Sequence, residues 1–368
     1  MEEKILKNFL ISKIKKIKDK KVFLRVDYNV PFKNKKPLEK HRIIVSFKTI
    51  NYLLKKGAKV FLVSHLGDPR GFSKNYSMKN IYYFLKNKFK GIQFLNFKET
   101  EKVLNGKKLT GNLFLLENIR FFNDKGGGNF LAKKISKNFD IYVNEAFSAS
   151  HRKHVSTYHL AKFLPTYFGF KFYEEIKNLS FWKKNKKVLL ILGGKKISTK
   201  YPLIKKFQKD SLVEKIILGG GILNFYLKNL GFDIKNSYIE EGFNKKITSK
   251  KILKIDDVVF FKDKIVDIGK KGIEEILKTI SSFKGIIIWN GPLGVVEDKK
   301  FSYSTKRLAI FLSKSKNYKI VGGGDTLAFL EKIKILNKFN YISTGGGAML
   351  YFLTYRTLPI LKLGRFSF

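Results

Sequence analysis

The chain has no cysteine among its 368 residues, and histidine and acidic residues are scarce. The absence of cysteine excludes disulfide scaffolds, thiolate metal sites and a cysteine nucleophile. The five histidines show no spacing typical of metal ligands; they are His41, His65, His151, His154 and His159. Long apolar runs are absent too, since stretches such as 188–192 and 286–289 fall far below the ~18–20 residues of a membrane-spanning helix.

Residues 1–21 do not look like a secretion signal. They are basic, but Glu2 and Glu3 are among them, and they contain no apolar core of ~7–15 residues. Together with the missing membrane span, this predicts a cytoplasmic protein with no membrane partner.

The scarcity of acidic residues leaves an extreme charge. Lys and Arg number 75 against 29 Asp and Glu, which gives a net charge of +46. Such a charge is typical of proteins that bind nucleic acids. Here, however, the excess is mostly Lys, spread from Lys4 to Lys362 and mixed with Ile, Asn and Phe, all residues with A/T-rich codons. Mutational bias is a sufficient explanation, so we expect no nucleic-acid partner; binding of another polyanion remains the alternative.

Length and periodicity predict two α/β domains. A chain of this length fits two domains, and short apolar runs alternate with amphipathic stretches, as in parallel sheets covered by helices. Helices are expected over 46–56 and 79–89. The expected strands are 22–26, 59–63, 113–117 and 141–143 in the first half, and 187–192, 215–218, 258–260, 285–289, 319–321 and 341–343 in the second.

The expected strands end differently in the two halves. Those of the first half lead into polar residues, namely Arg25, Asp27, His65, Arg120, Asn144 and Glu145. Those of the second half lead into the glycines at 193–194, 219–221, 291, 322–324 and 345–347. Because ligands of open parallel sheets bind beyond the carboxyl ends of the strands, one half should carry a cationic site and the other a glycine-lined site.

Glycine loops before helices expose backbone N–H groups that suit phosphate oxygens. Lys196 and Lys200 stand four residues apart after one such loop, and Asp325 and Thr326 after another offer a carboxylate and a hydroxyl for Mg²⁺ and phosphate. The alternative is that the lysines are solvated and Asp325 is an N-cap. Neither G-x-x-x-x-G-K-[ST] nor G-x-G-x-x-G occurs, which disfavours P-loop NTPases, protein kinases and typical Rossmann dehydrogenases.

The polar residues of the first half suit a small anionic substrate. Asp27 and Asn29 face the same way in an extended segment and could hold hydroxyl groups. Arginine is rare here beside lysine, and its fork binds phosphate or carboxylate bidentately. An anion pocket is therefore favoured over surface ion pairing for the cationic candidates Arg42, His65, Arg120 and Arg152.

Motifs over nearly the whole chain strengthen this interpretation. Residues 25–31 resemble R-V-D-F-N-V-P, with Tyr28 for Phe, and 142–154 resemble Y-V-N-D-A-F-x-x-x-H-R-x-H, with Glu145 for Asp. Further matches are S-H-L-G at 64–67, L-L-E-N-[LI]-R-F at 115–121, L-G-G-x-K-V-[SA]-[DT]-K at 192–200, G-G-G at 219–221, W-N-G-P-[VL]-G-V-F-E at 289–297, I-G-G-G-D-T at 321–326 and S-T-G-G-G-A at 343–348. In this order, the motifs resemble those of phosphoglycerate kinase.

The resemblance implies two Rossmann-like three-layer α/β domains whose parallel sheets face each other across a cleft and which a helix joins. The implied limits are 1–167 for a phosphoglycerate-binding domain, 168–182 for the joining helix, 183–350 for a nucleotide-binding domain, and 351–368 for a tail that returns to the first domain. A hinge-bending monomer is expected.

The implied reaction is reversible phosphoryl transfer from 1,3-bisphosphoglycerate to ADP in glycolysis, with Mg²⁺ near Asp325. By motif match the residues at the reacting group are Arg42, Lys196, Lys200, Gly323 and Gly346. Those holding phosphoglycerate are Asp27, Tyr28, Asn29, Arg42, His65, Leu66, Gly67, Asp68, Arg120 and Arg152. Those holding ATP or ADP are Gly194, Lys200, Gly219, Asn290, Pro292, Glu297, Gly323, Gly324, Asp325 and Thr326.

Three departures from the motifs bear on the site. Asp68 stands where the family has Arg, so we expect it to point away or to be paired, with Arg70 as the nearest guanidinium. The stretch 259–272 keeps only Asp-Ile-Gly of the family's L-D-x-G-P, and the usual Glu after 345–347 is missing. A catalytically decayed polyanion-binding protein of the same fold, or a kinase for another small molecule, remains the alternative.

Overall fold

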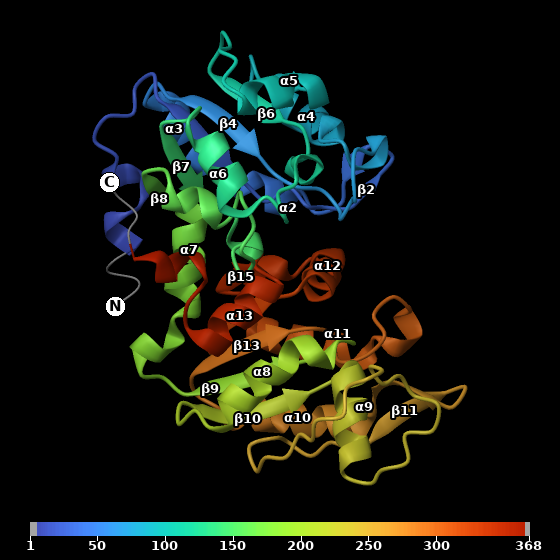
Figure 1. The fold of residues 1–368 in the computed structure, drawn as a ribbon. Helices are drawn as coiled ribbons and strands as arrows, with labels where there is room; N and C mark the ends of the chain where they lie inside the picture. Colours follow the sequence, from blue (N-terminus) through green and yellow to red (C-terminus); the bar gives the residue numbers. More distant parts are fainter. Residues whose placement is uncertain (1–5, 365–368) are drawn as a thin grey trace. The chain divides into compact units, whose positions relative to one another are not determined.

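The computed structural model describes residues 6–364, which form two compact units (Figure 1). Unit 1 contains the described residues up to Lys177 together with those from Thr357 onward, and unit 2 runs from Asn178 to Arg356. The first five residues of the predicted first domain and the last four of the predicted tail lie outside the described residues. Within 6–364, no helix combines the length and apolarity that crossing a membrane requires.

Unit 1 is built on a parallel sheet of six strands in the order β5-β6-β4-β1-β7-β8. The strands are β1 (Lys21–Arg25), β4 (Lys59–Val63), β5 (Gln93–Leu95), β6 (Leu113–Leu116), β7 (Ile141–Asn144) and β8 (Thr166–Phe168). A separate hairpin pairs β2 (Phe32–Lys33) with β3 (Lys36–Pro37). The helices are α2 (Lys40–Ile44), α3 (Phe47–Lys55), α4 (Lys79–Lys86), α5 (Phe97–Leu104), α6 (Gly128–Ser136) and α7 (Phe170–Leu179), which continues into unit 2.

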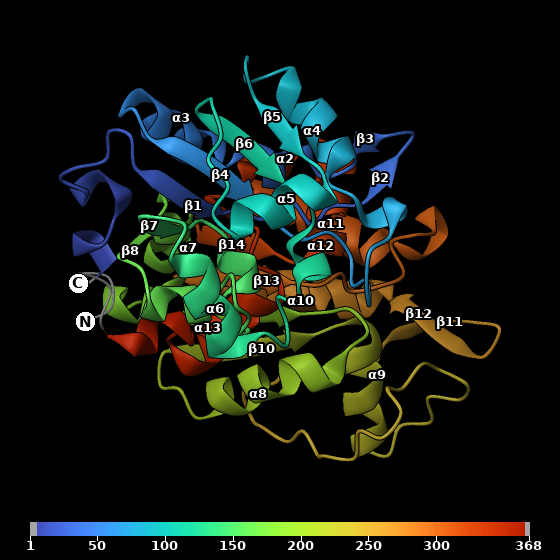
Figure 2. The ribbon, with the colours of Figure 1, turned by 45° about the horizontal axis from the view of Figure 1, so that its top comes forward.

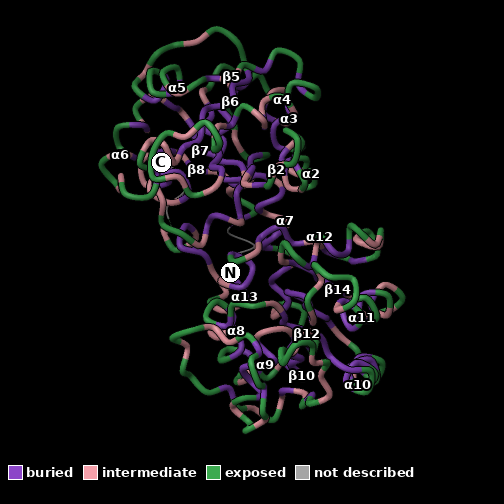
Figure 3. The backbone as a smooth tube through the Cα atoms, turned by 90° about the vertical axis from the view of Figure 1, so that its right-hand side faces the viewer, coloured by how far each residue is buried: buried purple, intermediate pink, exposed green. Residues whose placement is uncertain are grey.

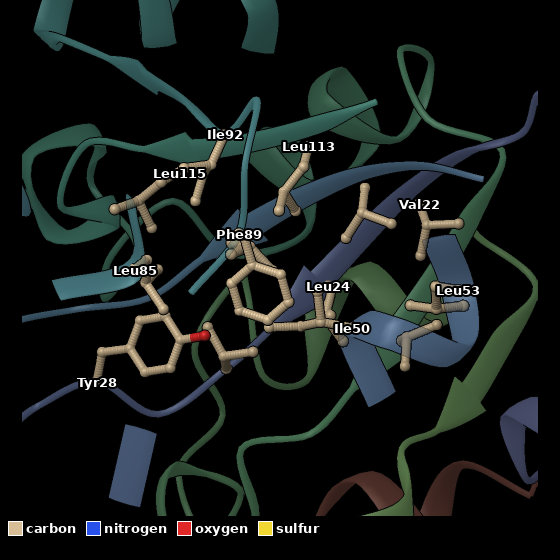
Figure 4. Close-up of a cluster of buried hydrophobic side chains, with 14 of the residues drawn as sticks. Val22, Leu24, Tyr28, Ile50, Leu53, Leu85, Phe89, Ile92, Leu113 and Leu115 are labelled. Carbon is tan, nitrogen blue, oxygen red and sulfur yellow. The ribbon is translucent and has the colours of Figure 1, made fainter. Parts of the chain in front are cut away.

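Alternation along the strands of unit 1 divides its core between the two faces of the sheet. On one face Leu24 belongs to the buried cluster that also holds Ile50 of α3 and Leu85 of α4 (Figure 4). Its neighbour Phe23 contacts Phe139 edge to face, with ring centroids 5.2 Å apart, on the other face. Most residues of the strands in the two parallel sheets are buried, as the colouring of Figure 3 shows, and burial of both faces explains their continuous apolar sequences.

Unit 2 has a five-stranded parallel sheet in the order β10-β9-β13-β14-β15. The strands are β9 (Val188–Leu192), β10 (Val213–Leu218), β13 (Ile286–Asn290), β14 (Tyr318–Gly322) and β15 (Tyr341–Ser343). The helices are α8 (Ile197–Gln208), α9 (Gly220–Asn229), α10 (Lys270–Ser282), α11 (Tyr303–Lys314), α12 (Gly324–Lys332) and α13 (Gly347–Tyr355). Helix α8 packs against α9 and α13, and α10 packs against α11. The expected pair of parallel α/β domains is confirmed.

One expected strand of the second parallel sheet is in fact part of a hairpin outside it. Strand β11 (Val258–Phe261) pairs antiparallel with β12 (Lys264–Ile268), and Figure 2 shows this hairpin beside α9. The strands pair with each other because the two-residue turn between them reverses the chain directly after β11. Both turn residues, Lys262 and Asp263, have positive φ.

A buried carboxylate fixes the start of α7. Glu145, just after β7, accepts hydrogen bonds from the Thr49 hydroxyl at 2.5 Å and from the backbone N–H groups of Lys171 and Phe172, each at 3.1 Å. Burial raises the pKa of Glu145 to about 7, although the hydrogen bond from Thr49 opposes the shift. A Cβ on Gly169 would lie 2.0 Å from this carboxylate, so glycine is required there.

Candidate active site

Three loops at the carboxyl edge of the first sheet are tied together by Asp27 and Asn29. Asp27 accepts hydrogen bonds from Arg42 Nη1 at 3.3 Å and from the hydroxyl of Ser148. Asn29 Oδ1 accepts from the N–H of Gly67 at 2.8 Å. The loops after β1, β4 and β7 are therefore joined through polar side chains that the sequence analysis assigned to substrate binding.

His65 is neutral and its tautomer is determined. Arg25, only 1% exposed, directs Nη2 to His65 Nδ1 at 2.9 Å. Because a guanidinium only donates, Nδ1 must accept, and the ring proton is on Nε2. Burial, followed by the charges of Arg25 and Arg120, holds the pKa of His65 well below its usual range.

Asp68 is paired with Arg120 and Lys125. Arg120 Nη1 donates to Asp68 Oδ1 at 3.0 Å and to the carbonyl of Gly67, and Lys125 Nζ pairs with the same carboxylate oxygen. The hydrogen bond from Lys125 lowers the pKa of Asp68 despite some desolvation. The expectation that Asp68 is paired is met, but exposed Arg70 is absent from this ion pair and only lines the adjoining cavity of about 510 Å³.

Arg152 is exposed, and a neighbouring histidine orients it. Its Nε donates to His151 Nε2 at 3.2 Å, while His151 Nδ1 donates to the carbonyl of Ser148 at 3.0 Å. Burial, and then the charge of Arg152, lowers the pKa of His151 to about 4, so the ring is a neutral acceptor for Arg152.

Two predicted substrate residues have side chains in the core. Tyr28 is fully buried in the apolar cluster of Figure 4, where its hydroxyl contacts the Ser46 hydroxyl at 2.9 Å. Leu66 belongs to the same cluster. The cause is the alternation after β1 that turns Asp27 and Asn29 one way and Tyr28 the other. Neither side chain can reach a ligand at the site, and the Tyr28 N–H already donates to Ser64 Oγ at 2.9 Å while the Leu66 carbonyl accepts from Asn118 Nδ2 at 2.7 Å.

A cavity of about 400 Å³ lies where the loops after β9, β10, β13 and β14 meet in unit 2. The residues assigned from sequence that line it are Gly194, Lys196, Lys200, Asn290, Pro292, Glu297, Gly323, Gly324, Asp325 and Thr326. Gly219 and Gly346 are not among the lining residues. Gly219 is instead a packing position, where a Cβ would lie 2.6 Å from Leu293 Cδ2, and Gly346 begins α13 with a φ of 48°.

The loops that form this cavity approach each other so closely that side chains are excluded. A Cβ on Gly193 would lie 1.8 Å from the carbonyl oxygen of Pro292. The N–H groups of Gly193 and Gly194 donate to the carbonyls of Asn290 and Pro292 at 3.0 and 2.9 Å. Backbone contacts between the loops after β9 and β13 therefore form this side of the cavity.

The two lysines of α8 differ in environment. Lys196 is the exposed N-cap residue, whereas Lys200 is 8% exposed and donates its Nζ hydrogen to the carbonyl of Gly193. Burial lowers the pKa of Lys200 to about 8, and the charge of Asp325 opposes the shift. Lys200 is thus a weakly solvated cation at the cavity wall.

The cavity offers a divalent cation one carboxylate near the glycines of α12. Asp325 is in the first turn of that helix, and the Thr326 hydroxyl accepts from the N–H of Gly291 at 2.9 Å. Within residues 6–364, no three Asp, Glu or His side chains gather into a metal site. This donor set fits Mg²⁺, which takes one or two carboxylates and completes its coordination with substrate phosphates and water.

The residues at the apolar end of the cavity were not assigned from the sequence. Leu223 and Asn224 of α9, Tyr238 of the following stretch and Ile265 of β12 line it. The available signal was the glycine junction at 219–221, because the first turns of the helix that follows a ligand-binding loop commonly reach the ligand. Ile265 lies in the stretch 259–272, whose departure from the family motif already pointed to the site, whereas Tyr238 had no signal.

Known proteins resemble the chain along nearly its whole length. The family described as phosphoglycerate kinase matches residues 11–257 and 242–356. Phosphoglycerate kinase of Dictyoglomus turgidum is 36% identical over 93% of this chain and 95% of its own, and that of Borreliella burgdorferi is 35% identical over 95% and 99%.

Solved structures agree with the sequence relatives. The phosphoglycerate kinase structure from Coxiella burnetii matches with a TM-score of 0.79 and 31% identity, covering 96% of this chain and 97% of its own. That from Pyrococcus horikoshii matches with a TM-score of 0.81 and 26% identity over 98% and 99%. The chain therefore belongs to the phosphoglycerate kinase family.

Proposed function

We propose that the chain transfers a phosphoryl group from 1,3-bisphosphoglycerate to ADP, giving 3-phosphoglycerate and ATP, with the acyl phosphate bound by unit 1 and the nucleotide by unit 2. The observation that carries this assignment is the unlike chemistry at the carboxyl edges of the two sheets. One edge carries cationic side chains, and the other carries a glycine-lined cavity with a buried lysine. The enzyme is a phosphotransferase with a carboxyl group as acceptor, and the reaction is a step of glycolysis.

In unit 1, Asp27 and Asn29 would bind the hydroxyl of phosphoglycerate, and the cations around them would bind its phosphate and carboxylate. Those cations are Arg42, Arg120 and Arg152, with His65 donating through Nε2. Arg42 and Arg120 each keep a buried Nε–H without an acceptor among the described residues, so the protein alone does not satisfy either guanidinium. A guanidinium N–H without an acceptor favours the binding of an anion that can accept its hydrogen bond.

In unit 2, the exposed carboxylate of Glu297 would accept hydrogen bonds from the ribose. The N–H groups of Gly323 and Gly324 begin α12, where the helix dipole favours phosphate. Lys196 and Lys200 would contact the phosphates nearest the transfer. Asp325 would hold Mg²⁺, which neutralises phosphate charge when it is bound.

Phosphoryl transfer needs alignment and charge neutralisation more than a nucleophilic side chain. Arg42 from unit 1 and Lys200 from unit 2 are proposed to neutralise the charge that spreads over the transferred group. Donor and acceptor are bound by different units, so the reaction requires hinge-bending that brings them together and excludes water. We also propose a cytoplasmic monomer.

A coupled assay of ATP formation from 1,3-bisphosphoglycerate and ADP tests the function. We expect Mg²⁺-dependent turnover in the wild type and loss of turnover in Lys200→Ala. Absence of turnover in a chain with native circular dichroism would instead support the decayed polyanion-binding alternative. Light scattering after size-exclusion chromatography tests the monomer.

A further inference from the structure

Asn224 is the polar side chain at the apolar end of the nucleotide cavity. It lies on α9, is 3% exposed, and lines the cavity together with Leu223, Ile265 and Leu293. Its Nδ2 donates to the backbone carbonyl of Tyr238 at 3.2 Å. Because a carbonyl oxygen only accepts, this bond fixes which end of the amide is the NH₂ group.

The other end of the amide has no partner. Asn224 Oδ1 is buried and accepts no hydrogen bond from any described residue. Buried polar atoms without a partner are uncommon in folded proteins, and they often mark a place where a ligand or water completes the bonding. The oxygen is an acceptor, so the missing partner is a donor.

Gly221 and Tyr238 line the same cavity as Asn224. A Cβ on Gly221 would lie 2.9 Å from Tyr238 Cδ1, so the tyrosine ring lies close against a glycine backbone. Tyr238 is 44% exposed and belongs to the stretch between α9 and β11, which has neither helix nor strand. Asn224 Oδ1 is itself covered in this structure, so a ligand reaches it only after neighbouring residues move.

We propose that Asn224 determines the base specificity of the nucleotide site. Its Oδ1 accepts a hydrogen bond from the 6-amino group of adenine, in a slot lined by Gly221 and Tyr238. Hypoxanthine and guanine carry an oxygen at that position, and two acceptors facing each other disfavour binding. The inference rests on the proposed function of the cavity and adds the residue that selects the base.

The first experiment removes the donor from the nucleotide. The kcat/KM of the wild type is measured with ATP, with purine riboside triphosphate, which lacks only the 6-amino group, and with ITP. We expect ATP to exceed purine riboside triphosphate by about fivefold, the value of one neutral hydrogen bond, and ITP to be poorer still. The difference should lie in KM, because the base is remote from the transferred group.

The second experiment removes the acceptor from the protein. Asn224→Leu keeps the approximate shape of the side chain, and it should reduce the ratio of ATP to purine riboside triphosphate to about one. Asn229→Leu is the matched control: Asn229 also lies on α9 and holds the following stretch through the N–H of Ile247 at 3.0 Å, but it does not line the cavity. It should leave the ratio unchanged even if every KM rises.

Equal use of ATP and purine riboside triphosphate by the wild type would overturn the inference and leave the proposed function intact. A fivefold ratio retained in Asn224→Leu would also overturn it. If Asn224→Leu turns over too slowly, calorimetric binding of ADP and purine riboside diphosphate gives the same ratio. Failure of the wild type with every nucleotide would instead overturn the proposed function on which the inference depends.

Discussion

The two candidate sites are built in opposite ways. In unit 1, side chains hold other side chains: Asp27 holds Arg42, Arg25 orients His65, and Asp68 pairs with Arg120. In unit 2, the cavity exists where side chains are missing and backbone carbonyls nearly touch the neighbouring glycines. Both sites lie at the carboxyl edge of a parallel sheet, as expected for such folds.

This difference predicts how each site fails. A network of charged side chains loses function when a charge is deleted, because the remaining partners reorient or stay unpaired. A cavity walled by glycine backbone loses function when atoms are added, because the carbonyls around it cannot move independently. Lys200 is the exception in unit 2, since it is a buried charged side chain at the cavity wall.

The largest effect is expected from deleting the charge proposed to stabilise the transition state in each unit. Lys200→Ala and Arg42→Ala should each lower kcat at least ~10²-fold, the usual cost of losing such an interaction. Steady-state kinetics with saturating substrates measures the loss, and circular dichroism checks the fold. Activity within threefold of wild type for either variant would contradict its assigned role.

The second-largest effect is expected from adding one carbon to the glycine-lined wall of the cavity in unit 2. Gly193→Ala places a Cβ 1.8 Å from the carbonyl oxygen of Pro292, so the loops must separate. We expect a KM for ATP at least ~10-fold higher and a loss of about 1–3 kcal/mol in the free energy of unfolding. Gly71→Ala is the control in unit 1, where a Cβ would meet nothing within 4 Å. Similar behaviour of the two variants would remove the contrast between the sites.

The contrast extends to pH through Lys200. Its lowered pKa of about 8 means that the charged form is present below that pH and is lost as pH rises through it. The nucleotide phosphates are fully ionised there, so kcat/KM for ADP should fall about fivefold between pH 8 and 9. Lys200→Arg keeps its charge and should remove the inflection. An unchanged inflection in that variant would assign the titration to another group.

Sequence patterns predicted the two parallel sheets and most of the polar site in unit 1. Apolar runs mark strands such as β9, and scarce arginines stand out in a lysine-rich chain. Strands β5 and β8 have only three residues each, too few for a periodic signal, and were missed; the equally short β15 stands out because the glycines 345–347 follow it.

The features that the sequence did not predict depend on contacts between residues far apart in the chain. Lys125 pairs with Asp68 across a distance in sequence that no local pattern encodes, whereas the sequence offered only Arg70 as the nearest guanidinium. Tyr238 reaches the cavity from a stretch without regular structure. Asn224 was hidden for a third reason, because a single amide on an apolar helix looks like an ordinary core residue.

A smaller effect is expected at the Asp68 pair. Removing the carboxylate in Asp68→Ala frees Arg120 and Lys125 for an anion, so the KM for 3-phosphoglycerate should fall about threefold. Lys125→Ala should raise it by a similar factor, since exposed ion pairs are worth little. Lys133→Ala, an exposed lysine on α6, serves as the control, and the KM for ATP should stay constant. A lower KM in Lys125→Ala would contradict a favourable contribution of Lys125 to binding of the anion.

The smallest effect is expected from titrating His65, and it separates the two sites most cleanly. Burial and the charges of Arg25 and Arg120 keep its pKa well below the usual value, so the ring stays neutral above pH 6. Its contribution to substrate binding is the Nε2–H donor, which does not change between pH 6 and 8. His65→Gln should therefore raise the KM for 3-phosphoglycerate by about the same factor at every pH in this range. The substrate phosphate titrates near the lower limit, but it does so equally for both proteins, and the ratio of their KM values cancels it. A ratio that increases toward pH 6 would mean that His65 gains a proton there, and the hydrogen bond from Arg25 would then have to break.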